Sequence, residues 1–535
     1  MRPEKKAKEL FKGAFILTFA ALIVKILSAV YRVPFQNMVG DVGFYIYQQV
    51  YPFYGVALVL STYGFPVVIS KLYTELSSRK DKNGVQHLFI TSALILFIIG
   101  FFCFAFLFWG ADWLAAQMKD PKLAILLKVI SVTFLIFPVV SLLRGFYQGK
   151  GNMVPTAVSQ VVEQFIRVLT IFLAAFLLTS KGYSLYVVGG GAAFGSVTGG
   201  ITAVIVLITF YWAGRRKSRL SLAKFNIQKI IHIARALLVQ GFAVCVSSML
   251  LVFLQMADSL NLYSMLISSG IDAHEAKELK GIYDRGQPLI QVGMVVATSM
   301  SLSLVPIIAS EKLNSNFAFM HDKIRLALKI ALFVGVAATV GLWNIIRPTN
   351  IMLFENSEGS DVLGVLSIII LLSSIIITVT AILQGLGIIL FPAFVILGSL
   401  AVKYVLNAIL VPPFGTMGAA GASCLTLSLI MVILLVKLRS QLRTPILNKR
   451  FILIVGIAAF SMFIVLRVYL YITGYAAGFN EERLFACFQA LSAVAVGGFS
   501  YLWIVLKGNT FKEKELSMLP FGSKLLFFLP KRNRR

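Results

Sequence analysis

Long, uninterrupted apolar runs limit what this chain can fold into. Fourteen runs are each close to 20 residues or longer, which is the length that an α-helix needs to cross the hydrocarbon core of a bilayer. They are continuously apolar rather than alternating, which excludes a membrane β-barrel. We predict an all-α polytopic membrane protein whose 14 transmembrane helices span residues 13–31, 43–70, 88–109, 123–143, 155–179, 184–212, 230–255, 281–309, 327–346, 362–384, 391–411, 417–436, 451–472 and 484–506.

Composition and charge agree with this architecture. Hydrophobic residues make up 58% of the 535 residues and charged residues 13%, whereas soluble domains average about 45–50% and about 25%. The net charge is +27, and the cations gather in alternate loops between the apolar runs. Because cytoplasmic loops are rich in Lys and Arg, this alternation places both termini in the cytoplasm. Anionic membrane lipids, rather than nucleic acid, account for the basic loops and for the basic tail PFGSKLLFFLPKRNRR.

Two parts of the chain resemble each other at nearly the same offset. QGKGNMVP at 148–155 matches QGLGIILFP at 384–392, and the segment around Pro66 matches the segment around Pro306. We therefore predict two six-helix lobes in parallel orientation, an arrangement typical of transporters that bind substrate between the lobes. Both prolines lie inside predicted helices and are expected to bend them. The predicted division is 1–220, 221–445 and a final part, 446–535, that contains helices 13 and 14 and the tail.

Charges inside the predicted spans indicate the kind of substrate. A charge at a helix centre costs about 2.5–3.5 kcal/mol on insertion scales, so it is expected to face a wet cavity or a partner. Lys25 and Lys403 lie deep, whereas the other cations except Arg167 lie near span ends, where the side chain reaches the interface. One acid, Glu163, stands against six cations: Lys25, Lys128, Arg167, Arg235, Lys403 and Arg467. Such a cavity suits an anionic, phosphate-bearing substrate.

Several of these charges have expected partners or positions. Glu163 and Arg167 are four residues apart on one helix face and can pair. The pair is interpreted as a self-neutralised structural pair, as a lock within the lobe, or as a site where Glu163 is a coupling carboxylate. Asp284 and Arg285 are adjacent near the start of the predicted eighth helix, and Arg32 ends the first. The sequence contains no Ser/His/Asp set, metal motif or nucleotide motif, so we expect no enzymatic activity, metal or other cofactor.

A glycine series in the predicted sixth helix is expected to serve packing. Gly191, Gly195 and Gly199 are spaced four apart in GGGAAFGSVTGG. Small residues at this spacing let two membrane helices approach closely. The series is not a nucleotide-binding loop, because no strand precedes it and no Lys-Ser/Thr pair follows it.

The first 75 residues carry a family resemblance. LFKGAFILTFAALIVKILSAVYRVPFQNMVGDVGFYIYQQVYPFYG and the following GFPVVISKLYTE resemble the polysaccharide-transport branch of the multidrug/oligosaccharidyl-lipid/polysaccharide (MOP) flippase superfamily, within the stage V sporulation protein B-like and MurJ-like lipid II flippase group. The resemblance implies a V-shaped pair of lobes, alternating access and a multi-pass location in the bacterial cell membrane. It also implies a substrate of the undecaprenyl-pyrophosphate-linked glycan class, moved from the inner to the outer leaflet.

The resemblance further assigns roles to individual residues. Lys25, Arg32 and Arg285 match the family cations that serve the pyrophosphate, and Asp284 matches the acid before the last of them. The family's helix 2 arginine has no counterpart in YPFYGVALVLS. Helices 13 and 14 are expected to form a groove for the lipid tail. Which glycan is carried, whether H⁺, Na⁺ or membrane potential drives transport, and whether cell-wall synthases take part stay open.

Three functional hypotheses follow. The favoured one is a flippase for lipid II or a related cell-wall or polysaccharide precursor. The second is a multidrug antiporter that exchanges organic cations for H⁺ or Na⁺ with Glu163 as the coupling acid; the shortage of acids within the spans argues against it. The third is a non-transporting scaffold for cell-wall enzymes, which the deep charges Lys25 and Lys403 argue against.

Overall fold

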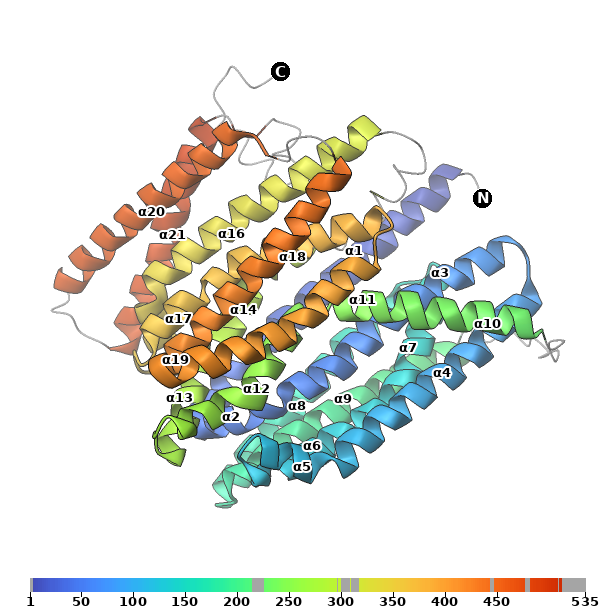
Figure 1. Ribbon diagram of the computed structural model, residues 1–535, viewed down its shortest axis with the longest axis horizontal. Helices are drawn as coiled ribbons and strands as arrows, with labels where there is room; N and C mark the ends of the chain where they lie inside the picture. Colours follow the sequence, from blue (N-terminus) through green and yellow to red (C-terminus); the bar gives the residue numbers. More distant parts are fainter. Residues whose placement is uncertain are drawn as a thin grey trace. The chain divides into compact units, whose positions relative to one another are not determined.

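The computed structural model describes residues 3–213, 226–295, 297–299, 308, 317–442, 447–476, 482–508 and 510–511. Within these ranges the chain is helical apart from short connections and contains no strand (Figure 1). Twelve helical segments among the described residues are long and apolar enough to cross a membrane. The predicted all-α polytopic architecture is therefore confirmed.

The chain forms two compact units, Met1–Asp284 with Ile388–Ala422 and Arg285–Gly387 with Ser423–Arg535. These boundaries differ from those of the predicted repeats, and the repeats stay a prediction. The elements of the first unit are α1 (Pro3–Val30), α2 (Arg32–Val59), η1 (Leu60–Gly64), α3 (Phe65–Ser78), α4 (Lys82–Trp109), α5 (Ala111–Gln117), η2 (Pro121–Leu123), α6 (Ala124–Ser131), α7 (Thr133–Gly149), α8 (Val154–Ser180), α9 (Leu185–Ala213), α10 (Ile227–Ala236), η3 (Leu237–Gly241), α11 (Phe242–Ser247), α12 (Leu250–Ser268), α13 (Ala273–Asp284) and the first part of α19 (Leu390–Leu442). Those of the second unit are α14 (Gly286–Gly293), α16 (Phe317–Phe354), α17 (Ser360–Leu366), α18 (Ile368–Gly385), the rest of α19, α20 (Lys449–Ala476) and α21 (Arg483–Lys507).

Two of the long helical segments contain sharp breaks at glycine. Gly40 within α2 has φ 70° and ψ −179°, and Gly415 within α19 has φ 57° and ψ −138°. Glycine tolerates these backbone angles because it lacks a Cβ. The breaks fall between the predicted first and second spans and between the eleventh and twelfth. The predicted eighth span begins in α13 and α14 and lies partly outside the described residues, so the count of 14 stays a prediction.

One predicted boundary was wrong. Residues 256–268 were expected to lie in an outside loop, but they continue α12 as far as Ser268. The polar residues Asp258 and Asn261 are buried here, and they interrupt the continuous apolarity by which a span is recognised in sequence. The helix that follows it is α13, Ala273–Asp284.

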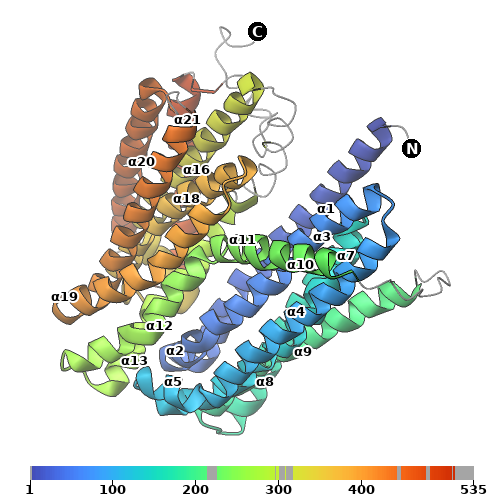
Figure 2. The ribbon, with the colours of Figure 1, turned by 45° about the vertical axis from the view of Figure 1, so that its right-hand side comes forward.

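The glycine series packs α9 against α8, as predicted. A Cβ at Gly195 would lie 2.9 Å from the Arg167 carbonyl oxygen, and one at Gly199 would lie 2.8 Å from the Glu163 carbonyl oxygen. The two helices lie side by side in both ribbon views (Figure 1 and Figure 2). This close packing fixes the part of α8 that carries the buried charges described below.

In the second unit, α20 and α21 pack with α16. Their shared core contains Phe333 on α16, Met462 on α20 and Tyr501 on α21, whose hydroxyl donates to the Phe333 carbonyl at 2.9 Å.

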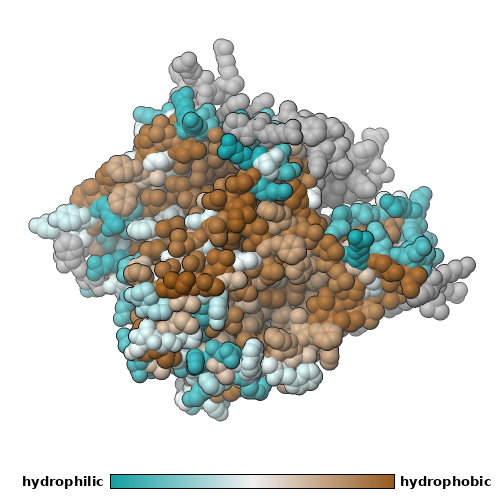
Figure 3. All heavy atoms as spheres, in the orientation of Figure 1, coloured by the Kyte–Doolittle hydropathy of each residue, from teal (hydrophilic) through white to brown (hydrophobic). Residues whose placement is uncertain are grey.

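Large apolar side chains also face outward, as on α4 of the first unit with Phe101, Phe102 and Phe106. Figure 3 shows apolar side chains over much of the visible face and hydrophilic ones toward its edges, the pattern of a surface in contact with lipid tails.

Candidate functional site

Two arginines share a buried group of tyrosines in the first unit. Arg32, the first residue of α2, and Arg167 on α8 are both fully buried. The Arg32 guanidinium carbon lies 4.4 Å from the Tyr51 ring centroid, and that of Arg167 lies 5.4 Å from the same centroid and 4.4 Å from that of Tyr54. Cations over tyrosine rings are attracted by the ring quadrupole, so the tyrosines form a platform for both guanidinium groups.

Arg32 has hydrogen-bonding capacity that the chain leaves unused. None of its three guanidinium nitrogens meets an acceptor with normal hydrogen-bond geometry in the described part of the chain. It also forms no ion pair with a described carboxylate. A buried charge without compensation is costly, and an arginine offers five N–H donors suited to carboxylate or phosphate oxygens. Arg32 is therefore a candidate anion-binding group.

Arg167 is held by tyrosines rather than by an acid. Its Nη2 donates to the Tyr31 hydroxyl at 3.0 Å and to the Tyr47 hydroxyl at 3.2 Å, and its Nη1 donates to the Gln164 Oε1 at 3.2 Å. The predicted pairing of Glu163 with Arg167 was wrong. The helical spacing allows the contact, but the Arg167 side chain is directed toward the tyrosines of α2, and the Glu163 carboxylate pairs with another cation.

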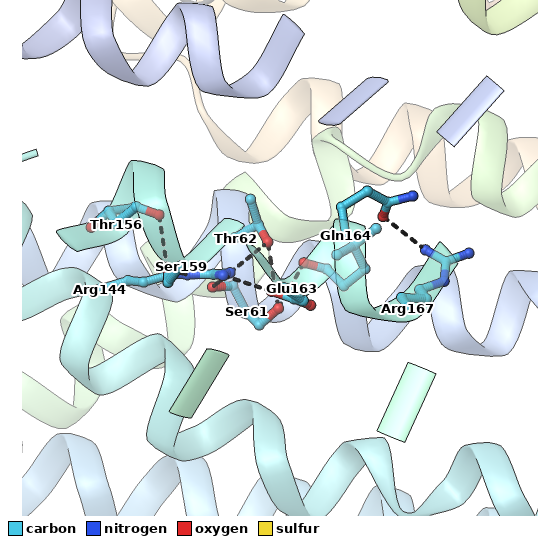
Figure 4. Close-up of polar contacts among 9 residues, drawn as sticks. Ser61, Thr62, Arg144, Thr156, Ser159, Glu163, Gln164 and Arg167 are labelled. Atoms are coloured by element: carbon cyan, nitrogen blue, oxygen red, sulfur yellow. Dashed lines mark hydrogen bonds and ion pairs between the residues drawn. The ribbon is translucent and has the colours of Figure 1, made fainter. Parts of the chain in front are cut away.

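The cation that pairs with Glu163 is Arg144 on α7. Its Nη2 lies 2.6 Å from the Glu163 Oε2, and it also donates to the Thr62 Oγ1, the Ser61 carbonyl and the Ser159 Oγ (Figure 4). Sequence analysis placed Arg144 beyond the end of the fourth span. The helix in fact continues to Gly149, which carries the guanidinium into the buried interior of the unit.

The Pro66 segment contains a helix irregularity. Residues 60–64 form a π-helical turn, and Pro66 follows at the start of α3. Proline has no N–H to continue the helical bonding, and π-turns within helices are frequent at functional sites. The bend at Pro66 stays a prediction, and this turn lies directly before the proline. Pro306, the matching proline, lies outside the described residues.

A second buried ion pair joins α12 to α19. The Lys403 Nζ lies 3.0 Å from the Asp258 Oδ1 and donates to the Ala419 carbonyl at 2.5 Å. The Tyr283 hydroxyl and the Asn407 amide also donate to this carboxylate. The expectation that Glu163 is the one acid inside the spans was therefore wrong. Lys403, predicted to be a cavity charge, is neutralised by Asp258 within the chain.

The remaining candidates are distributed over both units. Lys25 is half-buried on α1. Asp284, at the end of α13, is buried and pairs with Lys280 at 2.6 Å. Arg285 belongs to the second unit, where it is buried and its Nη1 donates to the Asn356 Oδ1 at 2.6 Å. The joint role of Lys25, Arg32 and Arg285 in holding pyrophosphate stays a prediction.

Comparison with known proteins identifies the family. Residues 10–311 match the family described as polysaccharide biosynthesis protein. The membrane protein YabM of Bacillus subtilis (strain 168), itself uncharacterised, is 44% identical over 526 residues, covering 98% of this chain and 97% of the relative. This chain belongs to the polysaccharide biosynthesis protein family. Lipid II flippase MurJ of the same organism is 26% identical over 525 residues, covering 93% of this chain and 95% of MurJ.

Solved structures show the same fold. A lipid II flippase MurJ in an inward closed conformation superposes with a TM-score of 0.65 at 17% identity, covering 92% of this chain and 98% of that one. An inward-facing MATE multidrug transporter of the MOP superfamily gives a TM-score of 0.60 at 14% identity, covering 78% and 95%. The family match and the membrane-protein relatives confirm the predicted polysaccharide-transport family and the location in a bacterial cell membrane. The solved structures show that the chain has the fold of MOP-superfamily transporters. The named relatives of known function are a flippase and a transporter.

Proposed function

We propose that this protein is an alternating-access flippase for an undecaprenyl-pyrophosphate-linked glycan, lipid II or a related cell-wall precursor. The observation that carries this proposal is the buried Arg32 guanidinium, which forms no ion pair with a described carboxylate and whose nitrogens meet no described acceptor with normal hydrogen-bond geometry. Arg167, which donates hydrogen bonds to Tyr31, Tyr47 and Gln164 but forms no ion pair with a described carboxylate, adds a second positive charge beside the same tyrosines. Two cations in a dry environment favour a ligand with two or more negative charges, and a pyrophosphate carries them on oxygens that arginine binds well.

The pairing of the buried acidic residues in the described part of the chain supports an anionic rather than a cationic substrate. Glu163 is paired with Arg144 and Asp258 with Lys403, so neither carboxylate is left to attract an organic cation. The antiporter hypothesis would need a free carboxylate at the substrate site. The family relationship to a lipid II flippase and the MurJ-like fold support the same choice.

Complementation tests the proposal. In a bacterium depleted of its own lipid II flippase, we expect the wild-type protein to restore growth and the appearance of lipid II at the outer leaflet. Arg32→Gln removes the charge and should abolish rescue, whereas Arg32→Lys keeps a cation and should retain part of it. Lys128→Gln is the matched control, because Lys128 is a solvent-exposed cation paired with Asp112.

The outcomes separate the parts of the proposal. Full rescue by an Arg32→Gln protein at normal membrane level would refute the role of Arg32. Failure of a well-inserted wild-type protein would refute lipid II as the substrate and direct the same assay to other polyprenyl-linked glycans. Broad sensitivity of a deletion strain to cationic drugs would favour the antiporter instead.

A further inference from the structure

The π-helical turn at residues 60–64 is stabilised by side chains from α7. The Ser141 Oγ donates to the Leu60 carbonyl at 2.9 Å, and the Arg144 Nη1 donates to the Ser61 carbonyl at 3.4 Å. In a π-turn the Ser61 carbonyl would accept from the N–H five residues later, but that residue is Pro66, which has none. Arg144 thus compensates for a backbone hydrogen bond that the sequence forbids.

The same guanidinium ties this turn to a carboxylate on another helix. Arg144 contacts Ser61 and Thr62 in the turn and Ser159 and Glu163 on α8 (Figure 4). The negative charge of Glu163 compensates Arg144, which is fully buried. The conformation of the turn is therefore linked to the charge state of Glu163.

A small cavity borders the carboxylate. Its volume is about 20 Å³, enough for about one water molecule. Polar groups from four helices line it, including Tyr54 and Ser61, Thr133, Glu163 and Ser196. The Glu163 side chain retains 11% exposure whereas Arg144 has none, so the carboxylate rather than the guanidinium faces the cavity. A water molecule here could deliver a proton to Glu163.

We propose that Glu163 is a proton-binding site that couples transport to a proton gradient by controlling the π-helical turn before Pro66. A hydronium ion in the cavity gives its proton to the carboxylate, leaving water, a neutral carboxylic acid and an Arg144 whose charge is no longer compensated. Because an uncompensated guanidinium is unfavourable in a dry interior, protonation favours a conformation in which Arg144 leaves the turn. The coupling part of this inference rests on the proposed transport function; the proton site itself does not.

Few other titratable groups face Glu163 among the described residues. Tyr54 on α2 lines the cavity, Arg144 on α7 pairs with the Glu163 carboxylate, and Arg167 lies one turn further along α8. α9 contributes Ser196 and Gly200, which do not titrate in the accessible pH range. A proton taken up at this cavity therefore has one carboxylate as its acceptor.

Infrared difference spectroscopy of the purified full chain in nanodiscs tests the site without any substrate. Lowering the pH should produce the absorption band of a protonated carboxylic acid. The Glu163→Gln variant should lack the part of this band that comes from Glu163. The Asp258→Asn variant, the matched control at the other buried ion pair, should keep it. If the Glu163→Gln variant does not fold, the Glu163→Asp variant is measured instead, and the pH at which half of this band appears should shift relative to the wild type. An unchanged component in Glu163→Gln, or an unchanged midpoint in Glu163→Asp, would overturn the inference.

A transport measurement tests the coupling. In proteoliposomes with labelled lipid II, an imposed pH gradient should raise the wild-type rate several-fold and should leave the Glu163→Gln rate unchanged. A Glu163→Gln protein that still responds to the gradient would overturn the coupling. A wild-type protein that shows the carboxylic-acid component but moves no lipid II would contradict the proposed substrate and leave the proton site standing.

Discussion

At the scale of single residues, four buried cations of the first unit fall into two classes. Arg144 and Lys403 have acidic partners within the chain, whereas Arg32 and Arg167 face tyrosines and have no described acidic partner. Removing one member of a buried pair leaves an uncompensated charge, but removing an unpaired charge relieves one. The two classes should therefore respond in opposite directions to neutral substitutions.

The Lys403–Asp258 pair tests the first class. The Lys403→Met substitution leaves the buried Asp258 carboxylate without its cationic partner. It should lower the free energy of unfolding by about 3–5 kcal/mol, which is typical when one member of a buried ion pair is removed. The double variant Lys403→Met/Asp258→Leu should recover most of this loss, because both charges are gone. Thermal unfolding of the purified proteins in detergent measures both effects. Equal loss in the single and double variants would show that the pair's charges do not matter.

Arg32 tests the second class. Arg32→Met replaces an uncompensated charge by an apolar side chain of similar length, so we expect an unfolding temperature equal to or above that of the wild type. Transport should nevertheless be lost, because the anion loses its binding group. Parallel unfolding and lipid-accessibility assays check this combination. A large drop in stability would instead assign Arg32 a structural role.

At the scale of elements, close helix approach depends on single glycines. A Cβ at Gly64, in the π-helical turn, would lie 1.8 Å from the Cys245 Sγ on α11. Gly64→Ala should therefore destabilise the protein by about 1–3 kcal/mol, a typical cost of overpacking. Adding Cys245→Ala removes the sulfur and should restore part of the loss. Gly456→Ala on α20, where a Cβ meets nothing within 4 Å, is the control in the same unfolding assay.

The start of α4 carries a pH-sensitive contact. The hydrogen bond from Lys229, supported by the Gly84 N–H, holds the pKa of Asp81 below its ordinary value. Because the unfolded chain then binds the proton more readily, the contact contributes its full stability above about pH 4 and loses it as the pH falls through the folded-state pKa. The stability of Asp81→Asn, which keeps a capping side chain, should vary less over this acid range. Unfolding temperatures measured against pH check the difference, and parallel curves would contradict it.

At the scale of the whole molecule, topology is the testable quantity. Fourteen helices with a cytoplasmic N-terminus place the C-terminus in the cytoplasm, because the number of crossings is even. A green fluorescent protein fused after residue 535 should therefore fluoresce, and an alkaline phosphatase fused there should be inactive. A fusion between the predicted first and second spans should show the reverse. An active phosphatase at the C-terminus would require an odd number of spans and would refute the count.

The apolar runs and the loop charges were enough to predict the class of fold. Burial in lipid demands long apolar helices, so membrane helices are visible in sequence without knowledge of their neighbours. The same logic missed residues 256–268, because α12 carries Asp258 and Asn261 inside a packed protein interior rather than against lipid. It also missed Arg144, whose helix continues past the apolar run that was used to define it.

The sequence by itself determined an all-α membrane protein, its family and the excess of cations within its apolar runs. Only the tertiary structure decided which charges are compensated. Glu163 lies four residues from Arg167 along α8, yet it pairs with Arg144 on α7, and Lys403 finds Asp258 more than a hundred residues away. Ion pairing inside a membrane protein depends on which helices pack together, and helix spacing along one chain segment does not contain that information. Arg32, which forms no ion pair with a described carboxylate after packing, is the residue on which the proposed substrate site depends.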